Sequence, residues 1–474
     1  MRVLRILLLA VVAWGCATNP ATGRRQLILM SEAEEIQIGR QSNEQIRTQM
    51  GVYDDPALQE YVASVGARLV RQSHRPNLPW TFTVIDEPAV NAFALPGGFI
   101  YLTRGILPFL QDESQLAGVL GHEIGHVDAR HSAEAYSKEL GAGLTLAGIG
   151  ILAPSTQAFQ GLAGAGLGVF FLKYGREAEL ESDRLGVEYA AGAGWDPRGV
   201  PGMLGTLDRL DNMGGTRRGV PNWALTHPPA ADRVERVQEA VAAAPPASTT
   251  NAAALERHLD GLVFGDSREK GMVRGSEFVH PILRFSVRFP EGWEIINGDA
   301  QVSAVPSESS NVAMLLQLAE GSGSVEQVAQ TQMTAGGWRQ TSGERTRING
   351  LDAYVGTYSG VSGNTPVMVQ AAHIRSNDRT FVVAGLAASN AFGSAAGTFS
   401  TAIGSFRALS TAEAERIQPN RIDFRVVRPG ETWESIARAA GEGGVDAPTL
   451  AIMNGADPGG LPRPGDRIRI VVGG

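Results

Sequence analysis

The pattern of apolar and polar positions predicts a mainly helical first half with a few short strands. Ser31 and Glu34 form the capping-box pair of a helix start. A further helix is predicted to begin at Asp112 or Ser114, since residues 113–120 are apolar on one face. The other elements predicted in this half are helices over 31–50, 56–71 and 177–191 and strands over 80–85 and 99–103.

A second globular region is predicted after a linker. Residues 242–254 are rich in Ala, Pro, Ser, Thr and Asn, which is typical of a linker. Residues 255–410 contain strand-like segments separated by Gly and Asn, and a closing helix over 395–408, which predicts an α+β domain with an antiparallel sheet. The segments are 285–289, 313–318, 353–358, 367–374 and 380–384. The scattered histidines here are predicted to be structural: His258, His280 and His373.

Residues 140–172 have an unusual composition. They are rich in Gly, Ala and Leu, and no charged residue occurs between Gly141 and Leu172. One interpretation is an apolar helical hairpin that covers an active site or touches a membrane. The other, slightly favoured, is a buried helix pair of the core. Pro154 divides the apolar run, which argues against a transmembrane helix of about 20 residues.

The chain begins with the pattern of a secretory signal over residues 1–15, a basic start followed by a short apolar run. Cys16, the only cysteine, follows at once. A sole cysteine at this place resembles a bacterial lipoprotein box, which implies acylation of Cys16 and, with Ala17 after it, sorting to the outer membrane. A plain cleaved signal with a free thiol is the alternative. Residues 16–30 are then predicted to form a lipid-anchored tether.

Composition and charge narrow the class of protein. A single cysteine allows no intramolecular disulfide, so stability must come from core burial. A chain of 474 residues is long enough for about three domains. The formal net charge is −8, and −10 without Arg2 and Arg5 of the signal, which argues against a nucleic-acid partner.

The candidate chemistry starts with His122, Glu123 and His126, an H-E-x-x-H motif. On a helix, residues i and i+4 share a face, so both imidazoles can bind one ion. Glu123 lies one position round the helix, where it can contact water instead of the metal. Ser132 stands where a longer variant of the motif needs histidine, and His131 is out of register, so His131 is predicted to be structural or at a helix end.

A second motif supplies the third ligand. Catalytic zinc sites use three protein ligands and an open position. Glu179 is the predicted ligand because Asp183, four residues later on the same face, can accept the outer N–H of a ligating histidine. Glu177 and Glu181 are the rivals. The expected ligands of one Zn²⁺ per chain are His122, His126 and Glu179.

These motifs resemble those of the HtpX-like and CAAX-prenyl-protease-like zinc metallopeptidases, in their soluble, BepA-like periplasmic branch. The resemblance covers roughly residues 30–240, and Ser182 stands where the family usually has Ala. It implies a mainly helical, gluzincin-type peptidase domain with a small sheet over 31–241. The matching blocks are N-A-F-A-L-P-G-G over 91–98, H-E-x-x-H over 122–126, R-x-x-E-x-x-S-D over 176–183, and T-H-P over 226–228 with Arg233 after it.

The resemblance implies roles for further residues. Strand 99–103 is implied to be an edge strand that pairs with an extended substrate. His227 is implied to stabilise the oxyanion or to fill the fourth zinc position in a resting state, and Arg233 to support the site. From the residues alone, an ordinary strand and a loop histidine are the simpler interpretations. The residues implied to contact substrate are Asn91, Ala92, Gly97 and Gly98.

The last 50 residues resemble a LysM module. Two short β-branched strands flank an amphipathic stretch with Pro-Gly turns at both inner ends, which predicts a βααβ module over 421–474. LysM modules bind N-acetylglucosamine-containing glycans, so the resemblance implies peptidoglycan as a partner. A LysM-like fold used only for protein contacts is the alternative. The implied glycan contacts are Gly430, Glu431, Thr432, Asn454 and Gly455.

The sequence thus predicts an α+β multidomain zinc metalloendopeptidase. In its mechanism, zinc lowers the pKa of bound water toward about 7, Glu123 carries the proton, and zinc with His227 stabilises the oxyanion. The expected place is the periplasm, tethered to the outer membrane. The expected substrates are misfolded or stalled envelope polypeptides, with the outer-membrane assembly machinery as a further partner. Two alternatives stay open: a peptidoglycan hydrolase, and a chaperone or scaffold with a latent site.

Overall fold

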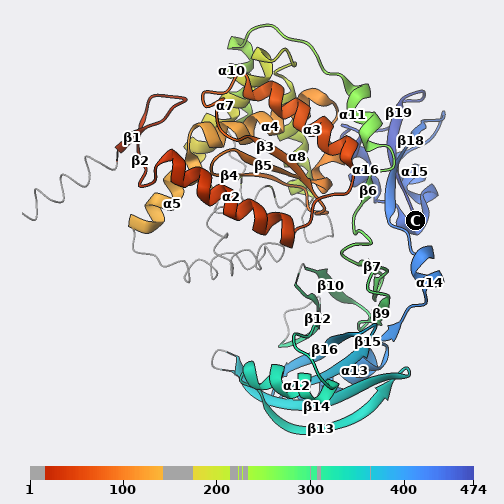
Figure 1. Cartoon of the computed structure of the whole chain (residues 1–474). Coiled ribbons are helices and arrows are strands. Elements are labelled where there is room, and N and C mark those ends of the chain that lie inside the picture. The colour runs from red at the N-terminus through yellow and green to blue at the C-terminus, as the bar shows by residue number, and fades with distance from the viewer. Residues whose placement is uncertain are drawn as a thin grey trace, which may run out of the picture. The chain divides into compact units, whose positions relative to one another are not determined.

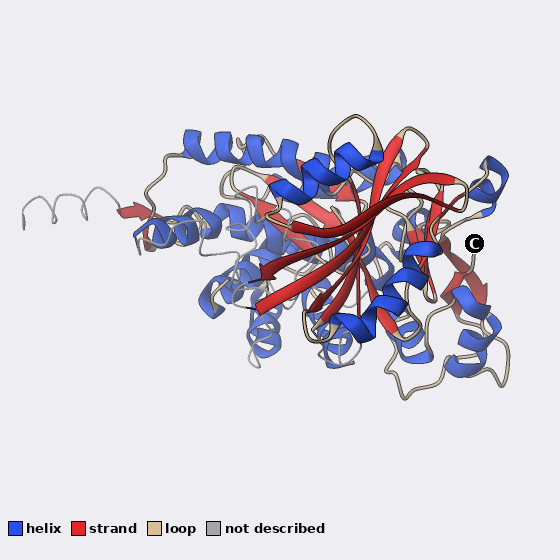
Figure 2. Cartoon of the chain, turned by 90° about the horizontal axis from the view of Figure 1, so that it is seen from below, coloured by secondary structure: helices blue, strands red, loops and turns tan. Residues whose placement is uncertain are grey.

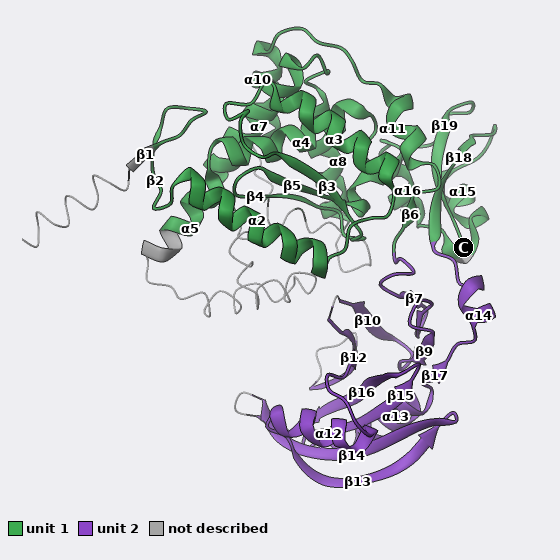
Figure 3. Ribbon diagram, in the orientation of Figure 1, with its two compact units in different colours: residues 1–265, 420–474 green, residues 266–419 purple. Residues whose placement is uncertain are grey.

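We describe the protein from a computed structural model. The structure describes residues 16–141, 174–213, 223, 227, 233–298, 300–306, 311–362 and 365–474. The predicted signal over 1–15, nearly all of the predicted hairpin, and the neighbours of His227 lie outside the described residues. The chain divides into two compact units, residues 1–265 with 420–474, and residues 266–419 (Figure 3). Among the described helices, none combines the length and apolar character needed to cross a membrane.

A three-stranded sheet lies at the centre of the first unit. Its order is β3 (Thr81–Ile85), β5 (Phe99–Thr103), β4 (Ala92–Leu95). β5 pairs in parallel with β3 and antiparallel with β4. The prediction that 99–103 is an edge strand is therefore wrong. β5 uses both of its sides for pairing, and β3 and β4 are the two edge strands of this sheet.

Helices cover both faces of this sheet, which explains why every residue of β4 and β5 is buried (Figure 1). Phe93 packs with Ile46 of α2 on one face, and Ala94 packs in the larger core that includes α4 on the other. The helices of this unit are α2 (Glu32–Gln49), α3 (Pro56–Val70), the 3₁₀ helix η1 (Arg104–Phe109), α4 (Glu113–Asp128), α5 (His131–Gly141), α7 (Arg176–Gly192), α8 (Gly199–Asn212), α10 (Arg233–Ala243) and α11 (Ala252–Leu259).

Glycines bring α4 and α7 into backbone contact. A Cβ atom at Gly121 would lie 3.1 Å from the Cα of Gly186, and one at Gly125 would lie 3.1 Å from the Cα of Ser182. A larger residue at either position would push the helices apart. The close approach lets carboxylates on α7 reach the histidines of α4. At the start of α4, Asp112 is the N-cap and accepts from the N–H of Gln115 at 3.1 Å.

The predicted tether is folded against the first unit. β1 (Cys16–Thr18) and β2 (Arg25–Leu27) form an antiparallel pair. Ile28 and Met30 are buried with Ala133 of α5. The lipid-anchored tether over 16–30 stays a prediction, and its apolar side chains Ile28 and Met30 pack on α5.

The C-terminal segment forms the predicted βααβ arrangement within the first unit. The buried Arg469 donates hydrogen bonds of 3.0 Å to the carbonyl oxygen of Met453 in its own segment and to those of Pro108 and Gln111. The last two bonds join this segment to the residues just before α4. β6 (Val263–Phe264) adds a third strand to its sheet. Its other elements are β18 (Asn420–Val426), α15 (Trp433–Ala439), the 3₁₀ helix η4 (Gly441–Gly443), α16 (Ala447–Met453) and β19 (Arg467–Val472).

The central unit is the predicted α+β domain with an antiparallel sheet (Figure 2). The seven-stranded sheet has the order β10 (Trp293–Asn297), β11 (Val302–Pro306), β12 (Val312–Leu318), β16 (Arg379–Ala388), β15 (Thr365–Ser376), β14 (Leu351–Ser362), β13 (Arg339–Ile348). A four-stranded sheet has the order β17 (Arg407–Ala408), β9 (Phe285–Arg288), β8 (Glu277–His280), β7 (Met272–Arg274). The helices are α12 (Val325–Ala335), α13 (Phe392–Gly404) and α14 (Thr411–Arg416).

The boundaries of the central unit differ from the predicted 255–410. The unit begins at Asp266 and ends at Pro419. Leu255 and Leu259 of α11 are buried in the core of the first unit, so the segment after the predicted linker belongs there. The linker itself is shorter than 242–254, because α10 and α11 extend into it from both sides.

Candidate metal centre

Four buried side chains of the first unit converge: His122 and His126 from α4, Glu179 from α7, and His227. One possible ligand atom from each lies within 4.8 Å of all the others. The Nε2 atoms of His122 and His126 are 3.0 Å apart, and the Glu179 carboxylate oxygens lie 3.7 and 3.6 Å from them. His227 Nδ1 lies 3.1 Å from Glu179 Oε1 and 3.3 Å from His122 Nε2. The structure therefore brings the three predicted ligands and His227 together.

The donor set fits a metal ion. Imidazole nitrogens with one carboxylate are a common ligand set of catalytic zinc. Within the described part of the chain, His227 Nε2 and both oxygens of the buried Glu123 have no hydrogen-bond partner. Glu123 Oε1 lies 3.5 Å from His227 Nε2. A buried carboxylate without hydrogen bonds is costly, and a bound water or substrate group beside the ion would satisfy it.

Asp183 and Arg233 support the cluster from outside. Asp183 Oδ1 lies 2.9 Å from His122 Nδ1, and Arg233 donates to the Asp183 carboxylate at 2.8 and 2.9 Å. Burial alone would raise the pKa of Asp183, but the bonds from Arg233 and His122 lower it to about 2. The permanent carboxylate accepts the Nδ1–H of His122, which leaves Nε2 free for a metal. Arg233 Nη1 also lies 3.0 Å from Glu179 Oε2.

Burial shifts the pKa values of two side chains on α4, Glu123 and His126. It raises the pKa of Glu123, against the opposing charges of His227 and His122. It lowers the pKa of His126 well below its ordinary value, and the neighbouring His122 adds to that effect. A neutral His126 is the form that can bind a metal.

His131 is the first residue of α5, in agreement with the predicted helix-end histidine, and it also contacts His126. Its Nδ1 lies 2.9 Å from His126 Nδ1, on the side away from the cluster. α4 ends at Asp128 and α5 starts at His131, and the left-handed backbone of Arg130 (φ 58°) turns the chain between them. The only sequence signal for this contact was a third histidine shortly after the motif. Helical spacing does not predict the turn at Arg130 that directs His131 toward His126.

The rival ligands and Tyr174 are also placed by the structure. Glu177 is exposed at the start of α7, while Glu181 faces His131 with Nε2 to Oε2 at 3.8 Å. Neither joins the cluster. The ring of Tyr174 stacks on His126 with centroids 4.0 Å apart, and its hydroxyl lies 2.8 Å from Ser132 Oγ. No motif pointed to Tyr174.

The four residues predicted to contact substrate are buried: Gly97 and Gly98 in the turn between β4 and β5, and Asn91 and Ala92 at the start of β4. Gly97 and Gly98 have φ of 82° and 100°, and a Cβ atom at Gly97 would lie 2.7 Å from the Cα of Ile36. The turn and its packing on α2 already require glycine at these positions, and their contact with substrate stays a prediction. Asn91 is fully buried, and its Oδ1 accepts a hydrogen bond of 2.9 Å from the N–H of Ala92, which is the first residue of β4.

Most of the predicted glycan residues hold the loops of the C-terminal segment together. Glu431 pairs with Arg425 at 2.5 Å, and Thr432 caps α15. Asn454 accepts from the N–H of Arg469 at 2.7 Å. A Cβ atom at Gly455 would lie 3.2 Å from Gln111. Gly430 is exposed.

Comparison with known proteins identifies two regions of the chain. Residues 56–241 match the model of peptidase family M48, and residues 426–471 match the model of the LysM domain. The first match contains the metal cluster, and the second runs from the end of β18 into β19.

Three curated relatives each match about two fifths of the chain. The chain is 33% identical over 219 residues to the beta-barrel assembly-enhancing protease of Escherichia coli (strain K12), covering 44% of each chain. It is 32% identical over 225 residues to the putative beta-barrel assembly-enhancing protease of Vibrio cholerae, covering 45% of this chain and 44% of that one. It is 34% identical over 181 residues to the mitochondrial metalloendopeptidase OMA1 of Schizosaccharomyces pombe, covering 38% of this chain and 52% of that one.

The chain spans about half the length of the curated relatives it matches. The family matches agree with the geometry of the first unit, which contains the buried cluster and its supporting carboxylate. The chain carries a peptidase family M48 domain, a metallopeptidase domain, over residues 56–241, and a LysM domain over residues 426–471.

Proposed function

We propose that this protein is a zinc-dependent metalloendopeptidase, with one Zn²⁺ held by His122, His126 and Glu179. The observation that carries the proposal is the position of Glu123. Its carboxylate is fully buried next to the cluster, and neither oxygen has a hydrogen-bond partner among the described residues. A base that must take a proton from water beside the metal needs this arrangement. Relatives that match part of the chain are named protease and metalloendopeptidase.

The residues of the chain have distinct tasks in the proposed mechanism. When bound, zinc supplies a Lewis acid that activates water and polarises the scissile carbonyl. Glu123 accepts the proton and later delivers it to the leaving amine, and its raised pKa suits proton transfer closer to neutral pH. Asp183 fixes the tautomer of His122, and Arg233 holds Asp183.

His227 supports a gated form of this mechanism. Its Nδ1 lies among the ligand atoms, where it would occupy the position that catalysis needs open, and its Nε2 lies on the side of Glu123. We propose that His227 closes the metal in a resting state and, once displaced, donates to the oxyanion of the reacting peptide. This observation also favours the second candidate, a latent site in a chaperone or scaffold.

The proposed setting is the bacterial envelope. The signal over 1–15, acylation of Cys16 and the LysM domain would tether the protein between the outer membrane and peptidoglycan, with Gly430 in an exposed loop available to glycan. Relatives carry the name beta-barrel assembly-enhancing protease. We therefore propose misfolded or stalled outer-membrane proteins as substrates and their assembly machinery as a partner.

The test is proteolysis of casein and of an unfolded outer-membrane protein by the purified chain without residues 1–15. Glu123→Gln should retain zinc and lose cleavage, because only the base is changed. His227→Ala should cleave faster than wild type if the resting state is closed. Glu188→Gln, an exposed glutamate on the same α7 as Glu179, is the matched control and should behave as wild type.

The outcomes separate the candidates. A wild type that binds zinc but is inert, with an active His227→Ala, establishes a gated enzyme. If zinc binds and no variant cleaves protein, the peptidase proposal fails. Purified sacculi are then the next substrate, since cleavage there would identify a peptidoglycan hydrolase.

A further inference from the structure

The two zinc-binding histidines of α4 have different supports. The outer nitrogen of His122 contacts Asp183, a neighbour of Glu179 on α7. The outer nitrogen of His126 contacts another histidine, His131, at 2.9 Å. His131 is only 4% exposed, so water does not compete freely for it.

The contact between His126 and His131 determines which nitrogen of each ring carries the hydrogen. If Nε2 of His126 holds the metal, its Nδ1 carries a hydrogen and donates it. Nδ1 of His131 must then be the acceptor, so the proton of a neutral His131 is on Nε2. That nitrogen faces Glu181 Oε2 at 3.8 Å. A carboxylate at this place favours the one tautomer of His131 that can accept from His126.

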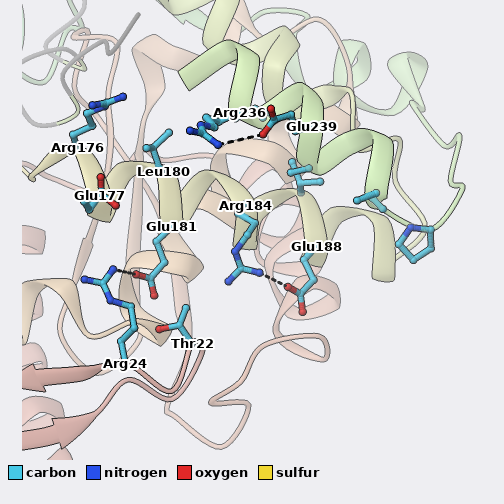
Figure 4. Close-up of a pocket in the computed structure, with 16 residues that line it drawn as sticks. Thr22, Arg24, Arg176, Glu177, Leu180, Glu181, Arg184, Glu188, Arg236 and Glu239 are labelled. Atoms are coloured by element: carbon cyan, nitrogen blue, oxygen red, sulfur yellow. Dashed lines mark hydrogen bonds and ion pairs between the residues drawn. The ribbon is translucent and has the colours of Figure 1, made fainter. Parts of the chain in front are cut away.

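Glu181 is in turn held by the N-terminal segment. Asn19 donates from Nδ2 to Glu181 Oε1 at 2.7 Å, and Arg24 Nη1 lies 3.7 Å from Glu181 Oε2. Figure 4 shows Arg24 and Glu181 facing each other across the edge of a pocket of about 940 Å³. These contacts hold the carboxylate group of Glu181 in place beside His131.

Asn19 is built into its place. It is 1% exposed, and its Oδ1 accepts from the backbone N–H groups of Ala21 and Thr22 at 2.9 and 3.2 Å. These bonds shape the turn between β1 and β2 and aim the amide NH₂ at Glu181. Further along, Gln26 donates to the carbonyl oxygen of Ala129 at 3.0 Å, at the end of α4. The segment is thus attached to both helices that supply the ligands.

We infer that Asn19, Glu181 and His131 are positioning residues for the metal ligand His126, so that the segment directly after Cys16 is a working part of the metal centre. The chain of contacts runs from Asn19 through Glu181 and His131 to His126. Each link fixes the orientation or the tautomer of the next. This inference rests on the proposed zinc site, but not on proteolysis.

The experiment measures zinc affinity by competition with a chelator, using the chain without residues 1–15. Glu181→Gln keeps the shape and removes the charge that orients His131. Asn19→Asp keeps the acceptor for Ala21 and Thr22 but replaces the donor to Glu181 with a like charge. His131→Phe removes the acceptor of the His126 proton. Glu188→Gln is the matched control, because Glu188 is exposed and its ion pair among the described residues is with Arg184 on the same helix.

We expect zinc binding to weaken about 10- to 100-fold in Glu181→Gln and His131→Phe, as is usual for partners of metal ligands, and less in Asn19→Asp. The visible spectrum of the cobalt-substituted protein should change in the same variants, which a general loss of stability would not cause. The double variant Asn19→Asp/Glu181→Gln should bind zinc no more weakly than Glu181→Gln, because both changes break one chain.

The result that overturns the inference is wild-type zinc affinity and an unchanged cobalt spectrum in both Glu181→Gln and Asn19→Asp. A wild type that binds zinc without cleaving protein overturns the proposed function only, because the affinity comparison can still be read. A wild type that binds no zinc overturns both.

Discussion

The two compact units both bury histidines, but in different surroundings. In the first unit His122, His126, His131 and His227 lie within reach of one another and of carboxylates on α7. In the central unit, His373 contacts Gln332 at 3.1 Å and His280 accepts from the N–H of Leu283 at 3.3 Å. No cluster of possible metal ligands occurs among the described residues there. A buried histidine by itself indicates a core position, and convergence with carboxylates indicates a site.

The largest expected difference between the units comes from removing one histidine from each. His126→Ala should weaken zinc binding by more than the roughly 100-fold expected for residues that support a ligand, and it should abolish proteolysis, because a ligand is lost. His373→Ala should leave both unchanged and lower only the stability of its own unit. Zinc analysis, casein cleavage and thermal unfolding measure the three effects. Zinc loss in His373→Ala would contradict the comparison.

The next largest effect concerns the support of His122. Asp183→Asn should weaken zinc binding about 10- to 100-fold, since the amide can present its N–H to His122 and the wrong tautomer is then favoured. It also leaves the buried Arg233 with one carboxylate fewer, which should cost on the order of 3 kcal/mol of stability. Chelator competition and chemical denaturation at pH 7 measure these effects. Wild-type affinity would show that the contact is only structural.

Acid should destabilise the central unit through its buried histidines. Burial lowers the pKa of His280 and of His373 to about 4, below the value of about 6.5 in an unfolded chain. The unfolded state therefore binds protons first as the pH falls. Stability is lost from about pH 6.5 down to about pH 4, where the folded state is protonated too.

At pH 5 each of these histidines should cost about 2 kcal/mol relative to neutral pH. Guanidinium unfolding at pH 7 and pH 5, in wild type and in His373→Gln, measures the effect. The variant should lose less stability than wild type over this range. An equal loss would show that His373 does not titrate in the unfolding transition.

The smallest predicted effect concerns the joint between the LysM domain and the peptidase domain. Burial lowers the pKa of Arg469 to about 10, so it stays charged at neutral pH. Arg469→Met would leave the carbonyl oxygens of Pro108 and Gln111 without this donor, at a cost of about 1 kcal/mol. Hydrogen exchange of residues 104–112 should then accelerate, while zinc affinity stays at the wild-type value. Unchanged exchange would show that the other contacts, such as Gln111 with Met453 and the shared core, hold the joint without Arg469.

Local sequence signals are enough to predict many of the helices and site residues of the first unit. The capping box of Ser31 and Glu34 and the N-cap at Asp112 are both present in the structure. The spacing of His122 and His126 sets their shared face, and Glu179 with Asp183 follows from the same helical rule. These features depend on residues within one or two helical turns, and helical geometry alone relates such residues.

Tertiary packing decided what depends on residues far apart in the chain. β5 lies inside its sheet because β3 pairs with it in parallel, and no local pattern in 99–103 shows on which side a partner lies. The predicted tether is folded because Ile28 and Met30 meet Ala133 more than a hundred residues later.

The features of the metal centre also fall into those predicted from local sequence and those decided by tertiary packing. The sequence by itself determined which residue types meet the metal, because ligand spacing on a helix is a local property. Only the tertiary structure decided that His131 turns back onto His126 after the break at Arg130, and that Asn19 reaches Glu181 across the fold. Such contacts depend on how helices and turns pack in space, and the identity of a residue does not specify its distant partner.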